Sequence, residues 1–251
     1  MKALITGASS GIGRDMARVL AQIGYDLILV ARRFDRLQEL KATIKNVNVK
    51  IIECDVSSEN NCINLYEQVK NEEIDFLINN AGFGLAGEFI NTSLDTELNM
   101  IKTNIMAVHI LTKLFLRDFV QRDNGIILNV ASSAAYMAGP LMSTYYATKN
   151  YVRRLSQAIY RELKDIGANV KISVLCPGPV NTEFNDVANV KFALKGLSSE
   201  YVARYAINQA LRGKLDIVPG TKMKAGTFLL RLTPTKLMLK ISGNIQKRKN
   251  E

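Results

Sequence analysis

The sequence has no tryptophan, five prolines and a single histidine, His109, in 251 residues. A catalytic or structural zinc site needs several nitrogen or sulfur ligands, and one histidine supplies too few of them. His109 also falls within 104–116, a stretch typical of a helix, where a lone histidine is more often structural than catalytic. A Ser-His-Asp triad and a histidine-based metal site are therefore both disfavoured.

Cysteines are also few. Cys54, Cys62 and Cys176 form no CxxC pair, which favours reduced thiols in a cytoplasmic protein over disulfides or zinc. No apolar run approaches the roughly 20 residues of a membrane-spanning helix. Met1 directly precedes an apolar strand-like run without the features of a secretory signal, so none is expected. The length fits a single α/β domain covering 1–251.

Acidic residues are nearly absent from the end of the chain. Residues 222–251 hold eight lysines and arginines and a single acid, Glu251. This segment therefore carries +7 of the chain's net charge of +10. The basic character therefore belongs to this tail. It does not indicate a nucleic-acid surface spread over the domain, and no nucleic-acid partner is expected.

Short apolar runs alternate with longer stretches that have helical periodicity. Strands are predicted at 2–6, 26–31, 50–54, 75–79, 125–130, 171–176 and 215–218. Helices are predicted at 11–23, 35–45, 59–72, 95–123, 145–165 and 199–213. This alternation predicts a Rossmann-like, doubly wound parallel sheet of about seven strands with helices on both faces.

A glycine-rich loop lies between the first predicted strand and the first predicted helix. Gly7, Gly11 and Gly13 allow the backbone to approach a ligand closely, and the helix start offers free N–H groups to a pyrophosphate. The spacing G-x-x-x-G-x-G differs from the G-x-G-x-x-G fingerprint, so a simple glycine-rich turn is the alternative.

The end of the second predicted strand favours one form of the cofactor. An acid at this place would bind the ribose 2′-hydroxyl of NAD, but Ala31 is followed by Arg32 and Arg33. Guanidinium groups suit the 2′-phosphate of NADP, so NADP(H) is preferred over NAD(H), and Arg32, which directly follows Ala31, is expected to carry this preference. The alternative is two solvated arginines at the start of a helix.

A tyrosine and a lysine lie four residues apart in Tyr145-Tyr146-Ala147-Thr148-Lys149. On a helix this spacing places both side chains on one face, and a nearby ammonium should lower the ordinary phenol pKa of about 10. Ser132, at the end of the fifth predicted strand, could hold a carbonyl oxygen. Tyr146 and Ser133 compete for these two roles, although only Tyr145 has the four-residue spacing.

With these motifs the chain resembles the short-chain dehydrogenase/reductase family over most of residues 1–182. The matching segments follow the predicted strands in order: Thr6-Gly7-x-x-x-Gly11-Ile12-Gly13, Asp55-Val56, Asn79-Asn80-Ala81-Gly82, Asn104, Ser132, Tyr145-x-x-x-Lys149 and Pro177-Gly178-Pro179-Val180-Asn181-Thr182.

The resemblance implies a role for each catalytic position. Tyr145 would be the acid/base, Ser132 would orient the carbonyl, Lys149 would bind the nicotinamide ribose and tune Tyr145, and Asn104 would hold a proton-relay water. Asp55 would contact the adenine amino group, Asn80 the adjacent ribose region, and the Val180 backbone with Thr182 the carboxamide. The implied cofactor-binding set is Gly7, Ser9, Ser10, Gly11, Ile12, Gly13, Arg32, Arg33, Asp55, Val56, Asn80, Ala81, Gly82, Lys149, Pro177, Gly178, Val180 and Thr182.

The resemblance also divides the chain into a dinucleotide-binding and catalytic core at 1–182, a substrate lid at 183–214 and a basic extension at 222–251. Many family members end soon after the last strand with a segment that builds a tetramer. This chain continues for about thirty residues, so a homodimer through the helices at 95–123 and 145–165 is favoured.

In the extension, Thr233-Pro234 predicts a helix start, and Leu237, Ile241 and Ile245 recur every four residues. This pattern predicts a basic amphipathic helix that packs on its own domain or on a partner. The alternatives are adhesion to an anionic membrane surface and docking of an acidic substrate carrier.

The predicted substrate is a partly apolar ketone, 3-oxoacyl chain or steroid-like ring, reduced to the alcohol or formed in the reverse direction. Apolar residues of the lid and of the segment between the serine and tyrosine motifs support this: Phe184, Phe192, Leu194, Leu197, Tyr136, Met137 and Met142. The rival functions are a non-catalytic NADPH-binding sensor or scaffold and a peripheral membrane-associated protein.

Overall fold

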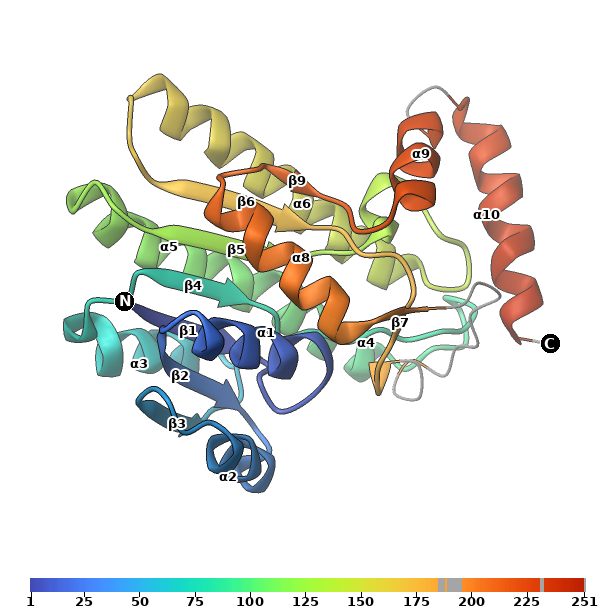
Figure 1. The fold of residues 1–251 in the computed structure, drawn as a ribbon. Helices are drawn as coiled ribbons and strands as arrows, with labels where there is room; N and C mark the ends of the chain where they lie inside the picture. The colour runs from blue at the N-terminus through green and yellow to red at the C-terminus, as the bar shows by residue number, and fades with distance from the viewer. Residues whose placement is uncertain (185–187, 189–195, 231–232, 251) are drawn as a thin grey trace.

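The computed structural model describes residues 1–184, 188, 196–230 and 233–250, and its centre is a parallel sheet of seven strands (Figure 1). The strand order is β3-β2-β1-β4-β5-β6-β9. The strands are β1 (Lys2–Thr6), β2 (Asp26–Ala31), β3 (Val49–Glu53), β4 (Phe76–Asn79), β5 (Ile126–Val130), β6 (Lys171–Leu175) and β9 (Asp216–Ile217). The predicted fold class is confirmed, and β1 and β2 have their predicted bounds.

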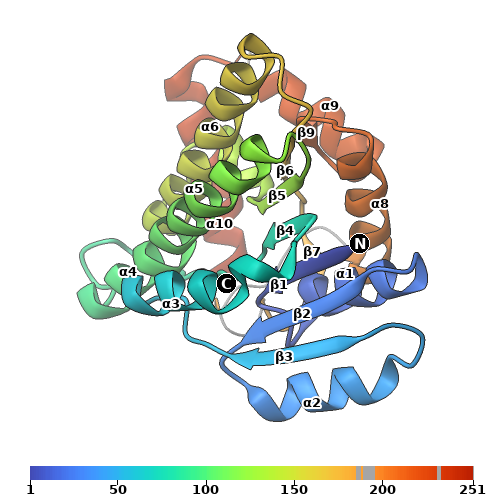
Figure 2. The ribbon, with the colours of Figure 1, turned by 90° about the vertical axis from the view of Figure 1, so that its left-hand side faces the viewer.

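Helices cover both faces of this sheet (Figure 2). One face carries α1 (Gly11–Gln22), α2 (Phe34–Thr43) and α8 (Ser199–Leu211), and the other carries α3 (Glu59–Val69), α5 (Ala107–Gln121) and α6 (Ser143–Asp165). The other elements are α4 (Leu94–Ile101), α9 (Thr221–Leu230), α10 (Thr235–Asn250), the short helical turns η1 (Lys70–Glu72), η2 (Lys102–Met106) and η3 (Ser133–Tyr136), and a pair of short strands, β7 (Val180–Asn181) and β8 (Leu197–Ser198).

Successive residues of each central strand point to opposite faces of the sheet. In β1, Ala3 and Ile5 join the core under α1 and α8, whereas Leu4 joins the core under α5 and α6. All three side chains are fully buried. Strands covered on both faces read as continuous apolar runs, which is why the sequence places them well.

The strand order reverses between β1 and β4. From β1 the chain continues to β2 and β3, and it then crosses to β4 on the other side of β1. Ligands of open parallel sheets bind beyond the carboxyl ends of the strands at such a reversal. The loops that begin at Gly7 and Asn80 therefore border the expected site.

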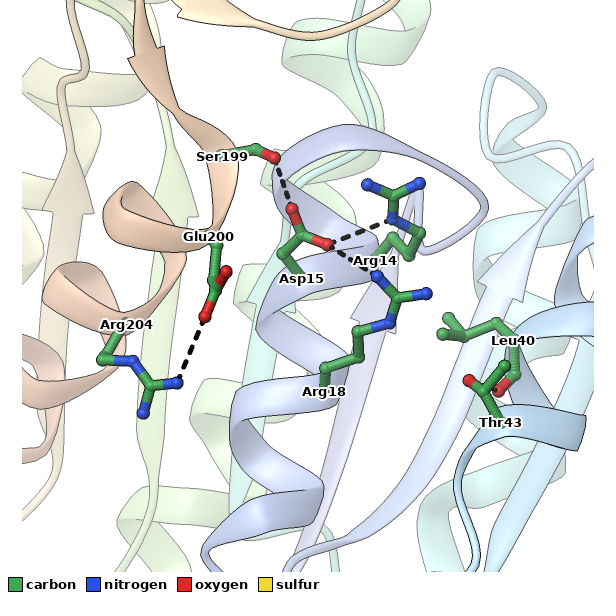
Figure 3. Close-up of polar contacts among 8 residues, drawn as sticks. All are labelled: Arg14, Asp15, Arg18, Leu40, Thr43, Ser199, Glu200 and Arg204. Carbon is green, nitrogen blue, oxygen red and sulfur yellow. Dashed lines mark hydrogen bonds and ion pairs between the residues drawn. The ribbon is translucent and has the colours of Figure 1, made fainter.

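α1 and α8 lie side by side, and polar side chains join them at the start of α8 (Figure 3). The buried Asp15 carboxylate accepts a hydrogen bond from the Ser199 hydroxyl and pairs with the guanidinium groups of Arg14 and Arg18 at 3.1 and 3.4 Å. Because α1 directly follows the glycine loop, this contact holds the loop's helix against the body of the domain.

The long helix predicted at 95–123 is present but irregular. α4 leads into the π-helical segment η2, and α5 follows without a break. A π-helical turn holds an extra residue and is frequent at functional sites. The fully buried Asn104 lies in this segment. Periodicity in the sequence does not reveal such an insertion.

The tail forms two helices instead of one. α10 begins at Thr235, and the N–H of Met238 donates to the carbonyl of Pro234 at 3.0 Å, so the helix starts after the predicted cap at Thr233. Leu237 and Ile241 of the predicted apolar stripe are exposed. α10 packs on the chain's own domain through Ser242 and Gln246, and Leu237 and Ile241 do not take part in that packing. Among the described helices, none has both the length and the hydropathy to cross a membrane.

Candidate active site

The glycine loop is folded tightly against the start of α1. Gly7 has a φ of +65°, a conformation that favours glycine, and a Cβ placed on Gly13 would lie 2.5 Å from the Gly7 carbonyl oxygen. Ile12 packs against the core below the loop. The first turn of α1 carries no acidic residue, so its N–H groups and positive dipole end suit an anionic ligand.

Hydrogen bonds tie this loop to the segment after β4. The Thr6 hydroxyl oxygen accepts from the backbone N–H groups of Asn80 and Ala81 at 3.0 and 3.1 Å. The Asn80 side-chain amide donates to the carbonyls of Thr6 and Gly7 at 3.1 and 3.0 Å. Asn80 therefore positions the glycine loop, and its contact with a ribose stays a prediction. The sequence alone did not indicate that the Thr6 hydroxyl joins the glycine loop to the segment after β4.

Of the two arginines after β2, Arg33 reaches the glycine loop. Its guanidinium donates to the Ser9 hydroxyl at 3.1 and 3.3 Å and to the Ser10 hydroxyl at 2.9 Å. Arg32 instead borders a cavity of about 600 Å³ that Asp55 also lines, at the ends of β2 and β3. Arg32 and Arg33 are successive residues directly after β2, and their side chains point in different directions: Arg33 toward the glycine loop and Arg32 toward the cavity.

Arg33 already holds an anionic side chain. The Glu183 carboxylate pairs with Arg33 at 3.0 Å and also with Arg36. The two guanidinium groups, with Arg36 contributing most, lower the pKa of Glu183. The Arg33 guanidinium beside two serine hydroxyls suits a phosphate group, which would take the place that the Glu183 carboxylate holds on Arg33.

The predicted adenine contacts lie after β3. The Asp55 carboxylate accepts from the Ser57 N–H at 3.0 Å, and Val56 is buried with its carbonyl near the Cys62 thiol at 3.2 Å. Asp55 thus stabilises the turn in which it lies, and it also lines the cavity that Arg32 borders.

Tyr145 and Lys149 lie together on the buried face of α6, with exposed fractions of 8% and 5%. The Lys149 ammonium is 5.8 Å from the centroid of the Tyr145 ring. It donates a hydrogen bond to the carbonyl of Val130, at the end of β5, at 3.0 Å. The four-residue spacing therefore brings the two groups to one place, and β5 anchors the lysine there.

Burial dominates the electrostatics of this pair. It raises the pKa of Tyr145 above the ordinary value of 10, and a hydrogen bond with Ser132 opposes the shift. Burial also lowers the pKa of Lys149 to about 8. The lowering of the phenol pKa expected beside Lys149 is therefore not found in the chain alone, because desolvation raises the pKa of the buried phenol. A buried phenol that keeps its proton suits donation to a carbonyl oxygen.

The alternatives for the serine and tyrosine roles are placed differently. Ser132 caps η3, where its hydroxyl oxygen accepts from the Ala134 N–H at 3.1 Å, and it also contacts Tyr145. The hydroxyl of Tyr146 accepts instead from the Gln246 side chain of α10 at 2.6 Å. The Ser133 N–H donates to the Pro177 carbonyl at 2.7 Å. This geometry favours Ser132 and Tyr145.

Asn104 joins three parts of the site. Its amide donates to the Phe83 carbonyl at 2.9 Å and to the Thr148 hydroxyl at 3.1 Å, and its oxygen accepts from the Phe83 N–H at 3.1 Å. Gly82 lies against both Asn104 and the Lys149 ammonium. The sequence analysis missed Thr148, although it stands between Tyr145 and Lys149 in the motif.

The segment after β6 closes the other side of the site. Val180 is buried in β7, Gly178 lies against Met223 of α9, and the methyl group of Thr182 lies against Gly11 at the start of α1. Thr182 is thus next to the N–H groups of the glycine loop. Its predicted contact with the carboxamide stays a prediction.

An apolar cluster surrounds Tyr145. The predicted residues Met142 and Phe184 belong to it, and the rings of Tyr145 and Phe184 have centroids 5.4 Å apart. The sequence analysis missed Met100 and Leu85, which come from other parts of the chain. Of the other predicted residues, Leu197 packs against the core under α1 and α8, and Phe192 and Leu194 lie outside the described residues.

Tyr136 contacts an ion pair between α6 and β9, in which Arg153 is buried and Asp216 is partly exposed. The Arg153 guanidinium lies 3.9 Å from the Tyr136 ring centroid and pairs with the Asp216 carboxylate at 2.9 and 3.0 Å. Arg153 is 3% exposed. The pair therefore holds the helix that carries Tyr145 against the edge of the sheet.

Replacement of Asp216 by alanine is expected to lower the free energy of unfolding by about 3–5 kcal/mol, because it leaves the buried Arg153 guanidinium uncompensated. Urea denaturation measures this loss. The matched control is Asp165→Ala, which removes an exposed pair with Arg161 and should cost less than about 1 kcal/mol. Equal losses in both variants would contradict a structural role for the pair of Arg153 and Asp216.

Known proteins resemble this chain in sequence and in fold. A family model described as short chain dehydrogenase matches residues 1–191. The 17-beta-hydroxysteroid dehydrogenase type 3 of Mus musculus is 34% identical over 75% of this chain and 63% of its own, longer chain. The NADP-dependent 3-hydroxy acid dehydrogenase of Schizosaccharomyces pombe is 36% identical over 73% of each chain. A solved short-chain dehydrogenase from Sphingobium yanoikuyae in complex with NADPH is 30% identical, with a TM-score of 0.84 over 94% of each chain.

Proposed function

The chain belongs to the short-chain dehydrogenase/reductase family of oxidoreductases, and on this premise we propose that it interconverts a carbonyl and an alcohol with NADP(H), using Tyr145 as acid and base. The observation that carries the proposal is the buried Tyr145 phenol beside Ser132 and Lys149. These groups lie beyond the carboxyl ends of the strands, where ligands of such sheets bind.

The residues of the site fit a dinucleotide phosphate. Gly7 and Gly13 pack too closely against Asn80 and Ala81 to carry a side chain, which keeps the loop folded at the start of α1, and that start has no acidic residue in its first turn. A nicotinamide dinucleotide, when bound, supplies the hydride chemistry. The residues proposed to hold it are Gly11 and Ile12 at the pyrophosphate, Ser9, Ser10 and Arg33 at the 2′-phosphate, Asp55 and Asn80 at the adenosine, and Lys149, Val180 and Thr182 at the nicotinamide end.

The chain's own groups then handle the proton. In the reducing direction Tyr145 gives its hydroxyl proton to the carbonyl oxygen, while the Ser132 hydroxyl holds that oxygen in place. The Lys149 ammonium, fixed by the Val130 carbonyl, stabilises the phenolate that remains. Asn104 joins the segments around Phe83 and Thr148 by hydrogen bonds. We propose that it also holds the water from which Tyr145 regains its proton.

The preference for NADP(H) rests on Arg33. Arg33→Gln is expected to raise the dissociation constant of NADPH about tenfold or more, because a hydrogen bond to a charged group contributes roughly 1.5–3 kcal/mol. The dissociation constant of NADH should stay nearly unchanged. Fluorescence titration of both cofactors measures the effect.

Arg32→Gln is the matched control for this prediction. Arg32 borders the cavity that Asp55 lines, away from Ser9 and Ser10, and its loss should change the NADPH affinity less than the loss of Arg33. If Arg33→Gln weakened NADPH and NADH alike, the proposed 2′-phosphate site would be refuted.

The apolar cluster around Tyr145 supports a partly apolar substrate. Met142 and Phe184 would contact the part of the substrate next to the carbonyl. The names of the relatives, a hydroxysteroid dehydrogenase and a 3-hydroxy acid dehydrogenase, support the same choice. We therefore propose a ketone, a 3-oxoacyl chain or a steroid-like ring as the substrate class.

Steady-state oxidation of NADPH against a panel of ketones, acyl thioesters and ring ketones tests the proposal. Mass spectrometry of co-purified ligands narrows the panel. Turnover with any member at a rate that depends on Tyr145 supports the proposed reaction. NADPH binding with no turnover across the panel would favour the rival function, a non-catalytic sensor or scaffold.

For the assembly, we propose a cytoplasmic homodimer formed through α5 and α6. Of the lid predicted at 183–214, α8 packs against α1 and the sheet as part of the core, so the proposed lid is the part before α8, where 185–187 and 189–195 lie outside the described residues. The exposed side chains of Val120 on α5 and Tyr151 on α6 support this choice of surface. His109 and Tyr151 join the two helices at 2.8 Å, so these helices present one continuous face.

A further inference from the structure

The two C-terminal helices expose large apolar side chains. Phe228 and Leu229 of α9 are each 61% exposed, and Leu237 and Ile241 of α10 are 50% and 46% exposed. Both helices lie beyond the carboxyl ends of the strands, at one end of the molecule (Figure 1). We call these four residues the tail apolar face.

Polar side chains of the same helices face the domain instead. Ser242 and Gln246 of α10 and Thr227 of α9 are buried. Gln246 donates to the Tyr146 hydroxyl at 2.6 Å, which fixes the direction in which α10 faces the domain. Leu237 and Ile241, four residues apart, share the opposite side. The amphipathic pattern is thus turned away from the core, and such exposed apolar surface marks an interaction site.

Lysines flank the tail apolar face. Lys222 of α9 and Lys236 and Lys240 of α10 are exposed, and no aspartate or glutamate occurs between residues 222 and 250. A second copy of the chain on this face would bring two strongly basic tails together. Apolar side chains interleaved with lysines instead suit a surface that offers both hydrocarbon and negative charge.

We propose that α9 and α10 form a docking surface for an anionic lipid bilayer. Leu237, Ile241, Phe228 and Leu229 would enter the boundary between headgroups and acyl chains, and the lysines would contact anionic headgroups. Gln246 holds α10 beside the segment that carries Tyr145 and Tyr146, and the proposed surface is the side of the helix that faces away from it. The contact is peripheral, and its test does not depend on turnover.

Co-sedimentation of the full chain with vesicles tests the proposal. Binding is expected to vesicles of phosphatidylcholine with phosphatidylserine, not to phosphatidylcholine alone, and to weaken at high salt. Leu237→Gln with Ile241→Gln, and separately Lys236→Gln with Lys240→Gln, should each lower the partition coefficient by about tenfold or more.

Matched controls come from the far end of the molecule. Ile23→Gln with Ile166→Gln removes two apolar side chains that are 45% and 65% exposed, and Lys41→Gln with Lys45→Gln removes the same charge. Neither control should change binding. The proposal is overturned if the chain does not bind anionic vesicles, or if the control variants lose binding equally. It is also overturned if Leu237→Gln with Ile241→Gln changes only the oligomeric state in sedimentation velocity, which would make this face an interface between copies.

Discussion

Tyr145→Phe is expected to lower kcat by roughly a thousandfold, within the range of about 10²–10⁴ that positioned acid–base catalysis contributes. The phenol is buried between Ser132 and Lys149, and phenylalanine keeps its shape while removing the proton that the carbonyl oxygen needs. The dissociation constant of NADPH should stay nearly unchanged, because the predicted cofactor contacts of the loop and of Arg33 remain. Stopped-flow turnover and fluorescence titration separate the two quantities.

Tyr146→Phe is the matched control for this experiment. It removes a hydroxyl from the adjacent ring, but that hydroxyl pairs with Gln246 and not with Ser132. Its kcat should stay close to that of the unchanged chain. Turnover retained in Tyr145→Phe, or an equal loss in Tyr146→Phe, would contradict the role proposed for Tyr145.

Lys149→Met is expected to abolish turnover and yet stabilise the fold. Burial lowers the pKa of Lys149 from 10.5 to about 8, which corresponds to roughly 3 kcal/mol of destabilisation by the buried ammonium. The lost hydrogen bond to Val130 offsets about 1 kcal/mol of the gain. The free energy of unfolding near neutral pH should therefore rise by about 2 kcal/mol.

The pH dependence gives this prediction a second readout. Between pH 8 and 10.5 the unfolded chain binds more protons at Lys149 than the folded chain does, so this group makes stability rise with pH. Its contribution should be absent in Lys149→Met. Burial raises the pKa values of Cys62 and Cys176 to about 12, which acts in the opposite direction above pH 9, and Tyr145 does so above pH 10. Urea denaturation of both chains should therefore be compared between pH 8 and 9.

Lys113→Met, which removes an exposed lysine of α5, is the control and should change stability little. A loss of stability in Lys149→Met would show that the ammonium supports the fold, and the proposed cost of placing it beside Tyr145 would be refuted.

The apolar runs of the strands and the order of the motifs suffice to predict the sheet. β1 and β2 match their predicted bounds because both faces of each strand are buried, which leaves a continuous apolar signal. The four-residue spacing of Tyr145 and Lys149 likewise predicts their shared face, since helical geometry is local. Local patterns thus determine the elements and the candidate residues.

Features that depend on contacts between distant segments could not be predicted in this way. The sequence favours Arg32 for the 2′-phosphate, as the residue after Ala31. In the structure Arg33 contacts the loop instead, because this contact depends on how the end of β2 meets Ser9 and Ser10. The π-helical segment around Asn104 also could not be predicted, because it leaves no visible change in the spacing of apolar residues along the sequence.

The sequence by itself determined the family, the parallel sheet and the list of candidate catalytic residues, because each follows from short-range spacing and motif order. Only the tertiary structure decided that desolvation dominates the pKa of Tyr145, since desolvation depends on everything packed around the phenol. It also decided that Leu237 and Ile241 face outward, because Gln246 of the same helix finds its partner on the domain. The spacing of apolar residues defines one face of a helix, whereas contacts with the rest of the fold determine whether that face is buried or exposed.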